Sequence, residues 1–253
     1  MKILAIETST KCFSLAVADG NKVIRHREVV LKKVLSDSII PAIQKILKEA
    51  RVPLAGLDGF AVGLGPGSFT SLRVGMATVK ALAFSTGKPV VGRPSLDLIA
   101  YNVIDQDFDE ICVIADARRN LLYAAIYQKD GQRLKQTADY QLIDLEKLLD
   151  QVNGKTLFVG DGIGLFRAQI EQIYAQAAKE KSTGCQAVFA DERFWFPKAA
   201  VLAQLAMERF EKGQFDKVDK LTPLYLYPMD CQVGSGVKKS KGQEVTRSVE
   251  NRG

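Results

Sequence analysis

The chain has 253 residues, of which 47% are hydrophobic and 25% are charged, so its composition excludes fibrous, collagen-like and wholly disordered proteins. Because a domain usually has about 100 to 200 residues, this length predicts two modest domains rather than an array of many modules. Half of the net charge of +6 lies after residue 233, so the body of the chain is not unusually basic and its charge alone does not indicate a nucleic-acid-binding protein.

The first half of the chain predicts three strands followed by alternating helices and strands. Asp19 and Gly20 mark a tight turn between the second and third strands. Ser36 and Asp37 can cap a helix whose apolar residues recur at helical spacing and which ends by Val52. The expected strands span residues 2–6, 13–18, 23–30, 59–64 and 89–91, and further helices are expected at residues 69–85 and from residue 95 onward.

The second half repeats this layout. In both halves an apolar strand ends at an acidic residue, a polar link leads to a second apolar strand, and a turn containing Asp-Gly leads to a third. This pattern predicts an α/β fold in which a mixed sheet covered by helices is built twice, with subdomains at residues 1–105 and 106–228. The second set of strands is expected at residues 110–115, 121–127, 133–138 and 156–159, and its helices at residues 144–152, 164–178 and 198–211.

Residues 63–75, which read GLGPGSFTSLRVG, form a glycine-rich turn between a strand and a helix. Glycines allow close approach of a backbone, and free N–H groups at a helix N-terminus favour an anion. The segment has neither the Gly-Lys-Ser/Thr of a Walker loop nor an in-phase GxGxxG, so a plain turn with a helix cap explains it equally well. The candidate anion-binding residues of this segment are Gly65, Gly67, Ser68, Thr70 and Arg73.

Acidic residues end the first strand of each half, at Glu7 and Asp116. In actin-like ATPases, residues at such positions hold magnesium or a catalytic water near nucleotide phosphates. Arg118 lies two residues after Asp116, and a structural ion pair is the more common use of such a neighbour. Glu7, Asp116 and Arg118 complete the set of candidate anion- or nucleotide-binding residues.

The types of residue that usually carry hydrolysis or bind metals are scarce. The single histidine, His26, lies in an expected strand and has no HxxxH or HxxE neighbour. The cysteines are scattered without a CxxC pair, which favours reduced thiols, and they are Cys12, Cys112, Cys185 and Cys231. We therefore expect no metal site and no catalytic residue of the Ser-His or Cys-His type.

Membrane and targeting segments are not expected. No run approaches the ~18 uncharged apolar residues of a membrane span, and the N-terminal apolar stretch ends at Glu7, too early for the core of a signal peptide. We expect a cytoplasmic protein without membrane contact. Residues 229–253 are polar, basic and rich in Gly and Ser, which predicts a disordered tail that acts as a solubilising extension or as an electrostatic contact for RNA.

The helix expected at residues 69–85 is apolar on nearly all sides. Between Ser68 and Gly87 only Arg73 and Lys80 are charged. Such a helix must be covered on more than one face, either by another helix of the same chain or by a partner protein.

Several motifs together resemble the TsaB family, also called YeaZ, whose members are bacterial subunits for the synthesis of threonylcarbamoyladenosine on tRNA. The resemblance spans roughly residues 1–228, and GPGSFTSLR is its specific part. Departures from the family pattern occur at Ser71, where a glycine is common, and at Tyr227, where an arginine is common. The motifs are ILAIETST at residues 3–10, GLGPGSFTSLRVG at residues 63–75, DAR at residues 116–118, GDG at residues 160–162 and PLYL at residues 223–226.

The resemblance implies the actin-like, sugar-kinase and chaperone ATPase (ASKHA) fold with two ribonuclease-H-like subdomains and mixed sheets. It also implies a non-catalytic scaffold that pairs through its first two helices with the catalytic subunit TsaD, is joined by the ATPase TsaE, and meets tRNA through the complex. The partner-interface candidates are Ile39, Ile43, Ile46, Leu47, Leu72, Met76, Val79 and Ala83.

Three points stay open at the level of the sequence. ATP or ADP with magnesium can bind at the interface of the complex, and the isolated chain can form a homodimer through an uncovered helical face. The alternative function is a self-sufficient magnesium-ATP-dependent kinase or ATPase of the same fold, which would use Glu7, residues 65–68 and Asp116.

Overall fold

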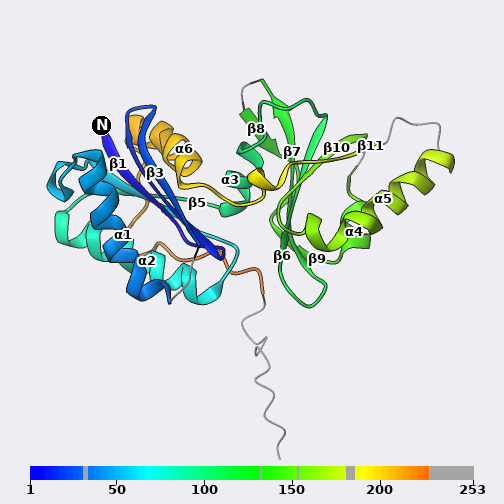
Figure 1. Ribbon diagram of the computed structural model, residues 1–253. Coiled ribbons are helices and arrows are strands. Elements are labelled where there is room, and N and C mark those ends of the chain that lie inside the picture. Colours follow the sequence, from blue (N-terminus) through cyan, green and yellow to red (C-terminus); the bar gives the residue numbers. More distant parts are fainter. Residues whose placement is uncertain (31–33, 132, 153, 181–185, 228–253) are drawn as a thin grey trace, which may run out of the picture.

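The computed structural model describes residues 1–30, 34–131, 133–152, 154–180 and 186–227, which form two lobes, each built on one sheet (Figure 1). The first sheet has the strand order β3-β2-β1-β4-β5. The three strands at the start of the chain pair antiparallel, and the other two run parallel to β1. These strands are β1 (Lys2–Glu7), β2 (Cys12–Asp19), β3 (Lys22–Val30), β4 (Gly59–Gly63) and β5 (Val90–Arg93).

The second sheet has the equivalent order β8-β7-β6-β10-β11 with the same strand directions, which confirms the predicted internal repeat. The short strand β9 (Gln141–Ile143), which the sequence did not indicate, pairs with β7. The edge strand β11 was also not expected. The strands of this sheet are β6 (Glu110–Asp116), β7 (Leu122–Asp130), β8 (Arg133–Gln136), β10 (Lys155–Val159) and β11 (Gln186–Phe189).

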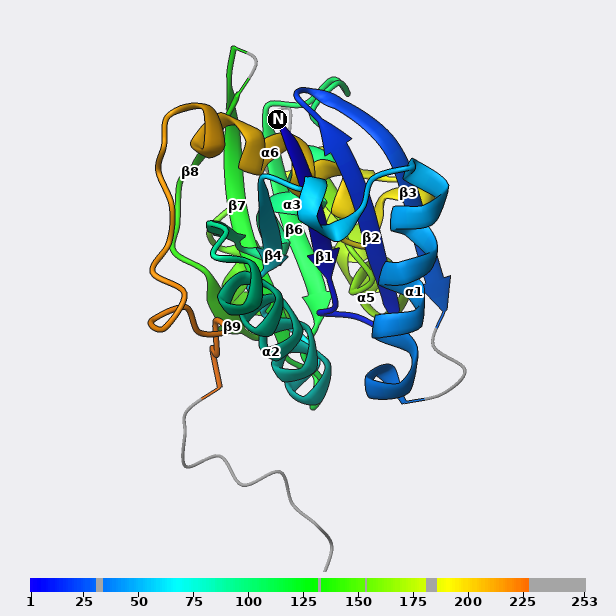
Figure 2. The same ribbon diagram turned by 90° about the vertical axis from the view of Figure 1, so that its left-hand side faces the viewer.

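The helices cover both sheets, so the molecule is layered as helix, sheet, helix, sheet and helix (Figures 1 and 2). On the outer face of the first sheet lie α1 (Leu35–Ala50) and α2 (Phe69–Thr86), and on its inner face lies α6 (Ala199–Glu211). The helix α3 (Ser95–Tyr101) packs between the lobes. The outer face of the second sheet carries α4 (Leu145–Leu149) and α5 (Ile163–Glu180), and 3-10 turns occur at Leu54–Gly56 and Glu192–Phe194.

Strand β1 illustrates why apolar runs form the centre of this fold. Successive side chains of a strand point to opposite faces, and both faces of the first sheet are covered by helices. Leu4 and Ile6 pack in the cluster with α1 and α2, while Ile3 and Ala5 pack in the cluster with α6. The strand is therefore apolar at every position between Lys2 and Glu7.

The subdomain division predicted at residues 106–228 needs a correction. Only the part from β6 to β11 builds the second lobe, because α6 returns to the inner face of the first sheet and buries its apolar side there. The predicted disordered tail, residues 229–253, lies outside the described residues. Within the described part of the chain, no helix combines the length and hydrophobicity needed to cross a bilayer.

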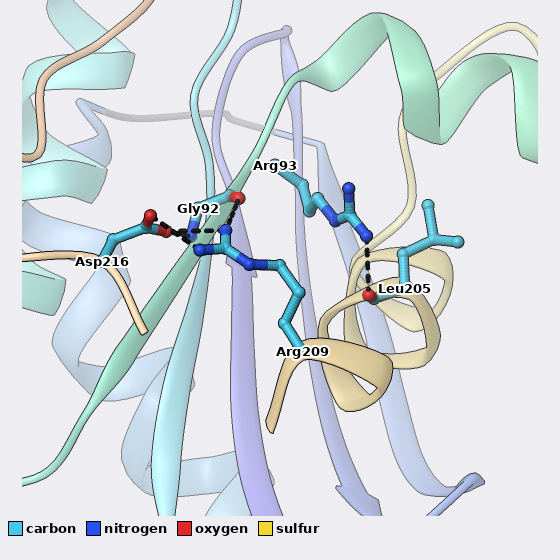
Figure 3. A network of polar contacts seen from close by, with 5 residues as sticks. All are labelled: Gly92, Arg93, Leu205, Arg209 and Asp216. Atoms are coloured by element: carbon cyan, nitrogen blue, oxygen red, sulfur yellow. Dashed lines mark hydrogen bonds and ion pairs between the residues drawn. The ribbon is translucent and has the colours of Figure 1, made fainter. Parts of the chain in front are cut away.

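The segment after α6 stays with the first lobe because a carboxylate anchors it to the edge strand β5 (Figure 3). Asp216 forms a two-pronged ion pair with the Arg209 guanidinium at 2.8 and 2.9 Å, and it accepts a hydrogen bond from the Gly92 N–H at 2.7 Å. The Asp216 N–H donates to the Val90 carbonyl at 2.9 Å. Burial alone would raise the pKa of Asp216, but the hydrogen bonds and the arginine charge outweigh it and hold the pKa below its ordinary value.

The two lobes are tied together through α3. The Asp97 carboxylate of α3 accepts hydrogen bonds from the hydroxyls of Tyr127 and Tyr140 in the second lobe, at 2.7 and 2.6 Å. The Asn102 amide donates to the carbonyls of Phe194 and Phe196, both at 2.9 Å. These polar ties surround apolar contacts between α3 and the second sheet.

Candidate functional site

The glycine turn between β4 and α2 is packed against the end of β1. A Cβ atom at Gly67 would come within 2.2 Å of the Ser9 carbonyl oxygen, so the position excludes a side chain. That same carbonyl accepts a hydrogen bond from the Ser68 N–H at 2.7 Å. Gly65 has a positive φ of 88°, and a Cβ there would press on Leu72. The glycines are required by close packing within the chain.

Glu7 is fully buried and joins three segments by hydrogen bonds. The Ser9 N–H donates to its Oε1 at 2.6 Å, and the Ser95 hydroxyl donates to its Oε2 at 2.8 Å. The Gly65 N–H in turn donates to the Ser95 Oγ at 3.0 Å. Burial raises the pKa of Glu7, while the bonds from Ser9 and Ser95 oppose that rise. The carboxyl group therefore connects β1, the glycine turn and the start of α3.

The candidate anion-binding residues of the first lobe thus fall into two groups. Glu7, Gly65 and Gly67 form a closed junction in which the Gly65 N–H already donates to Ser95. Ser68, Thr70 and Arg73 lie on the first turns of α2 with exposed side chains. The structure brings the two groups together in space, but it places only the second group at the surface.

Asp116 and Arg118 lie in the second lobe, at the hairpin between β6 and β7. The Arg118 side chain, which is 86% exposed, pairs with the Asp116 carboxylate at 3.2 Å, as the sequence favoured. Arg118, Arg119 and Asn120 have positive φ values of 69°, 54° and 59°, so three residues in left-handed conformation form the tip of this hairpin.

Asp161, from the GDG turn, is a residue of this region that the sequence did not single out as a candidate. Its Oδ1 accepts a hydrogen bond from the Asp116 N–H at 3.0 Å. Burial raises the pKa of Asp161 and the Asp116 charge adds to the rise, while the Asp116 N–H and the charge of Lys11 lower it. Lys11 comes from the β1–β2 hairpin, so the two hairpins face each other across the seam between the lobes. The signal for Asp161 in the sequence was its position in the internal repeat, directly after the strand expected at residues 156–159.

The eight partner-interface candidates lie in the interior of the first lobe. Their exposed fractions are between 0 and 8%, since they form the face of α1 and α2 that packs on the first sheet and between the two helices. Most of each of these side chains thus points inward, although Ile43 and Leu47 also line a groove beside α1, and Ala83 lines a groove beside α2. The residues concerned are Ile39, Ile43, Ile46, Leu47, Leu72, Met76, Val79 and Ala83.

The outward side of the same two helices carries large apolar side chains, which we call the α1–α2 surface. Phe84 is 68% exposed and Ile40 is 46% exposed. A groove of about 580 Å³ between α1 and α2 is lined mainly by apolar residues, including Ile40, Leu54 and Leu82. A second groove of about 500 Å³ lies on the other side of α2, beside Phe84, Pro89 and other residues.

Metal-binding groups are sparse in the described part of the chain. No set of three or more His, Cys, Asp or Glu side chains there is arranged to hold a metal ion. His26 is exposed on the edge strand β3. Cys12 and Cys112 are free thiols, and burial raises the pKa of Cys112 well above its ordinary range. Cys185 lies outside the described residues, as does Cys231.

Comparisons with known proteins agree with the motifs. A family model described as TsaD, tRNA N6-adenosine threonylcarbamoyltransferase, matches residues 29–228. The tRNA threonylcarbamoyladenosine biosynthesis protein TsaB of Bacillus subtilis (strain 168) is 33% identical over 177 residues, which are 68% of this chain and 76% of that protein. The protein of the same name from Escherichia coli (strain K12) is 27% identical over 233 residues, 89% of this chain and 94% of that protein. The solved structure of YeaZ from Pseudomonas aeruginosa has a TM-score of 0.73 at 22% identity, covering 89% of this chain and 99% of that one.

Two lobes with one repeated strand order, joined by α3 and covered by helices, define a protein of the ASKHA fold with two ribonuclease-H-like units. This is the fold class that the sequence predicted. Within it, the chain belongs to the TsaB (YeaZ) family, inside the wider group that the TsaD family model describes.

Proposed function

We propose that the chain takes part in the biosynthesis of threonylcarbamoyladenosine on tRNA as a non-catalytic subunit that docks a TsaD-type transferase. The names of its relatives support a role in this biosynthesis, since they are called tRNA threonylcarbamoyladenosine biosynthesis proteins. The α1–α2 surface supports the docking role, and it is the observation that carries the proposal. Exposed apolar side chains gain free energy when a partner covers them.

The shape of the α1–α2 surface suits a helical partner. Phe84 stands beside one groove, and Leu82 lines the other, so side chains of a partner helix can enter on both sides of α2. Ala77 and Ala81, exposed on the same helix, leave room for a close approach of helix axes.

The resemblance to the TsaB family adds the other parts of the proposed assembly. TsaE joins the pair as its ATPase, and the transfer of the threonylcarbamoyl group takes place on TsaD. ATP or ADP with magnesium binds where the subunits meet. Without TsaD, the α1–α2 surface pairs with a second copy of the chain.

A single exposed substitution tests the docking surface. We expect Phe84→Asp to lower co-purification with TsaD at least tenfold, because a carboxylate would have to lose its water on entering an apolar interface. Leu165→Asp on α5, where Leu165 is 62% exposed, is the matched control and should leave pairing intact. Circular dichroism verifies that both variants fold. Equal pairing of both variants would contradict the proposal.

The self-sufficient ATPase remains the alternative prediction, and calorimetry separates it from the docking role. Binding of magnesium-ATP with a micromolar Kd, together with turnover by the isolated chain, would support the enzyme. Heat signals that appear only after TsaD is added would support a nucleotide site that the two subunits share.

A further inference from the structure

The groove between α1 and α2 changes from apolar to cationic along α1. The residues that line it are apolar except for Gln44, Lys48 and Arg51. Both basic residues lie at the C-terminal end of α1, whereas Ile40, which is 46% exposed, lies two turns earlier on the same helix. The eight residues from Ile40 to Lys48 span about 12 Å along the helix axis at 1.5 Å per residue.

No carboxylate of the groove balances its two cations. Acidic side chains are absent from the described residues that line it. Within the part of the chain that the structure describes, Lys48 and Arg51 are exposed and form no ion pair. Glu49 is the acidic residue nearest to them in the sequence, and it pairs with Arg27 of β3 at 2.8 Å. The cationic end of the groove is therefore open to a negative charge from outside the chain.

The end of α1 does not need these side chains as hydrogen-bond donors. Basic residues in a last turn suit the partial negative charge of a helix C-terminus, which is a general reason for their presence. Here the backbone already satisfies the final carbonyls. The Arg51 N–H donates to the Lys48 carbonyl and the Val52 N–H donates to the Leu47 carbonyl, both at 3.1 Å. The two charged groups thus remain available to an acceptor on a partner.

We propose that the groove selects a partner helix that carries a carboxylate facing Lys48 and Arg51 and an apolar side chain about two turns away that packs on Ile40. Residues seven or eight positions apart lie on the same face of an α-helix, so one helix can present both groups. The inference rests on the proposed function, because the helix is assigned to the TsaD-type transferase. The apolar contact supplies most of the affinity, while the charges determine the choice of partner and speed its association.

Surface plasmon resonance with immobilised TsaD and the full chain tests this selection. We expect Lys48→Glu to lower the association rate constant about tenfold at about 50 mM salt, because attraction between the groove and the carboxylate is lost. Lys45→Glu is the matched control, since Lys45 is exposed on the same helix but does not line the groove. It changes the net charge equally and should alter the rate constant less than about twofold. Circular dichroism verifies that both variants fold.

The dependence on salt gives a second measurement. Salt screens the attraction between opposite charges, so the wild type and Lys45→Glu should associate more slowly as the salt concentration rises. Lys48→Glu leaves the groove with one charge of each sign, and its association rate constant should be nearly independent of salt. A purely apolar docking surface would give the same salt dependence in all three proteins.

Equal effects of Lys48→Glu and Lys45→Glu, or the same salt dependence in both, would overturn the proposal. A dimer of the chain that Lys48→Glu breaks, with unchanged association to TsaD, would assign the groove to a second copy and overturn it as well. Phe84→Asp separates this test from that of the docking role. If Phe84→Asp pairs like the wild type, the docking role fails; if Phe84→Asp loses pairing and Lys48→Glu does not, only the charge selection fails.

Discussion

At the scale of single residues, Glu7 shows how a strand end that could serve chemistry is used for packing. Its carboxyl oxygens are occupied by the Ser9 N–H and the Ser95 hydroxyl. A Cβ at Gly63 would collide with the carboxyl group, so the strand next to β1 also leaves space for it. The residue therefore supports the turn from which α2 starts.

The raised pKa of Glu7 predicts a pH-dependent stability. Because the folded state binds this proton more tightly than the unfolded chain, the contribution is complete below the ordinary pKa of 4.5 and is lost as the pH rises through the folded-state value. Glu7→Gln has no proton to lose; its oxygen still accepts from the Ser9 N–H, and its NH2 group can donate to the Ser95 Oγ in place of the bond that Oε2 accepts. We expect the Tm of Glu7→Gln minus that of the wild type to rise as the pH increases above 4.5, measured by scanning calorimetry at a series of pH values. A difference that does not change with pH would contradict this account.

The residue scale also shows what the sequence could not reveal. The helical spacing of Ile39, Ile43 and Ile46, and of Met76 and Val79, correctly marks a face that something must cover. Periodicity does not say whether the cover is the same chain or another one, and here it is the first sheet. The proposed docking surface rests instead on exposed apolar residues out of phase with that spacing, such as Ile40 and Phe84.

At the scale of elements, most strands and helices could be predicted because both faces of each sheet are covered, which makes the strands apolar runs. The missed elements are short or lie at edges: β9 has three residues and β11 has four. Helix α1 begins at Leu35 rather than after the expected cap, since the Ser36 hydroxyl bonds to Asp37 and no side chain caps the helix. The return of α6 to the first sheet was not visible either, because it depends on contacts between residues far apart in the sequence.

The segment after α6 gives the prediction at this scale. Removing the Asp216 carboxylate leaves the Gly92 N–H without its acceptor and leaves the Arg209 guanidinium with only the Gly92 carbonyl, so Asp216→Ala should loosen residues 212–227 from β5. We expect amide exchange in this segment to become about tenfold faster, measured by hydrogen–deuterium exchange and mass spectrometry.

Asp219→Ala is the control, because the Asp219 side chain is exposed three residues further along the same segment. Equal protection in the two variants would mean that the ion pair does not hold the segment. Because the pKa of Asp216 lies below its ordinary 3.8, its stabilising contribution should be present above that pH and be lost as the pH falls further.

At the scale of the whole molecule, the lobes behave as one unit because α3 is shared between them. Its residues pack both with α6 and with the second sheet. Asp97 adds two hydrogen bonds to tyrosines of the other lobe, in a partly buried setting. The β1–β2 hairpin of the first lobe and the β6–β7 hairpin of the second lobe are thereby held at a fixed distance from each other.

Asp97→Ala should uncouple the lobes. We expect a loss of about 2 kcal/mol in the free energy of unfolding, since two hydrogen bonds to a charged acceptor disappear. The single tryptophan, Trp195, packs with the outer core of the second lobe and reports on that lobe, and circular dichroism reports on the whole chain. The two unfolding curves should coincide in the wild type and separate in the variant. Asp105→Ala, at an exposed neighbouring residue, is the control, and its two unfolding curves should coincide. Coincident curves in both variants would show that apolar contacts alone hold the junction.

The return of α6 also sets an order for assembly on the ribosome. Strands β1 to β5 leave the exit tunnel first, but Ile3 and Ala5 find their cover only when Leu202 and Ala206 have been synthesised. The second lobe, whose elements run without interruption from β6 to β11, can close earlier. The part of the chain made first is thus among the last to be sheltered, and during translation it depends on whatever protects nascent apolar strands.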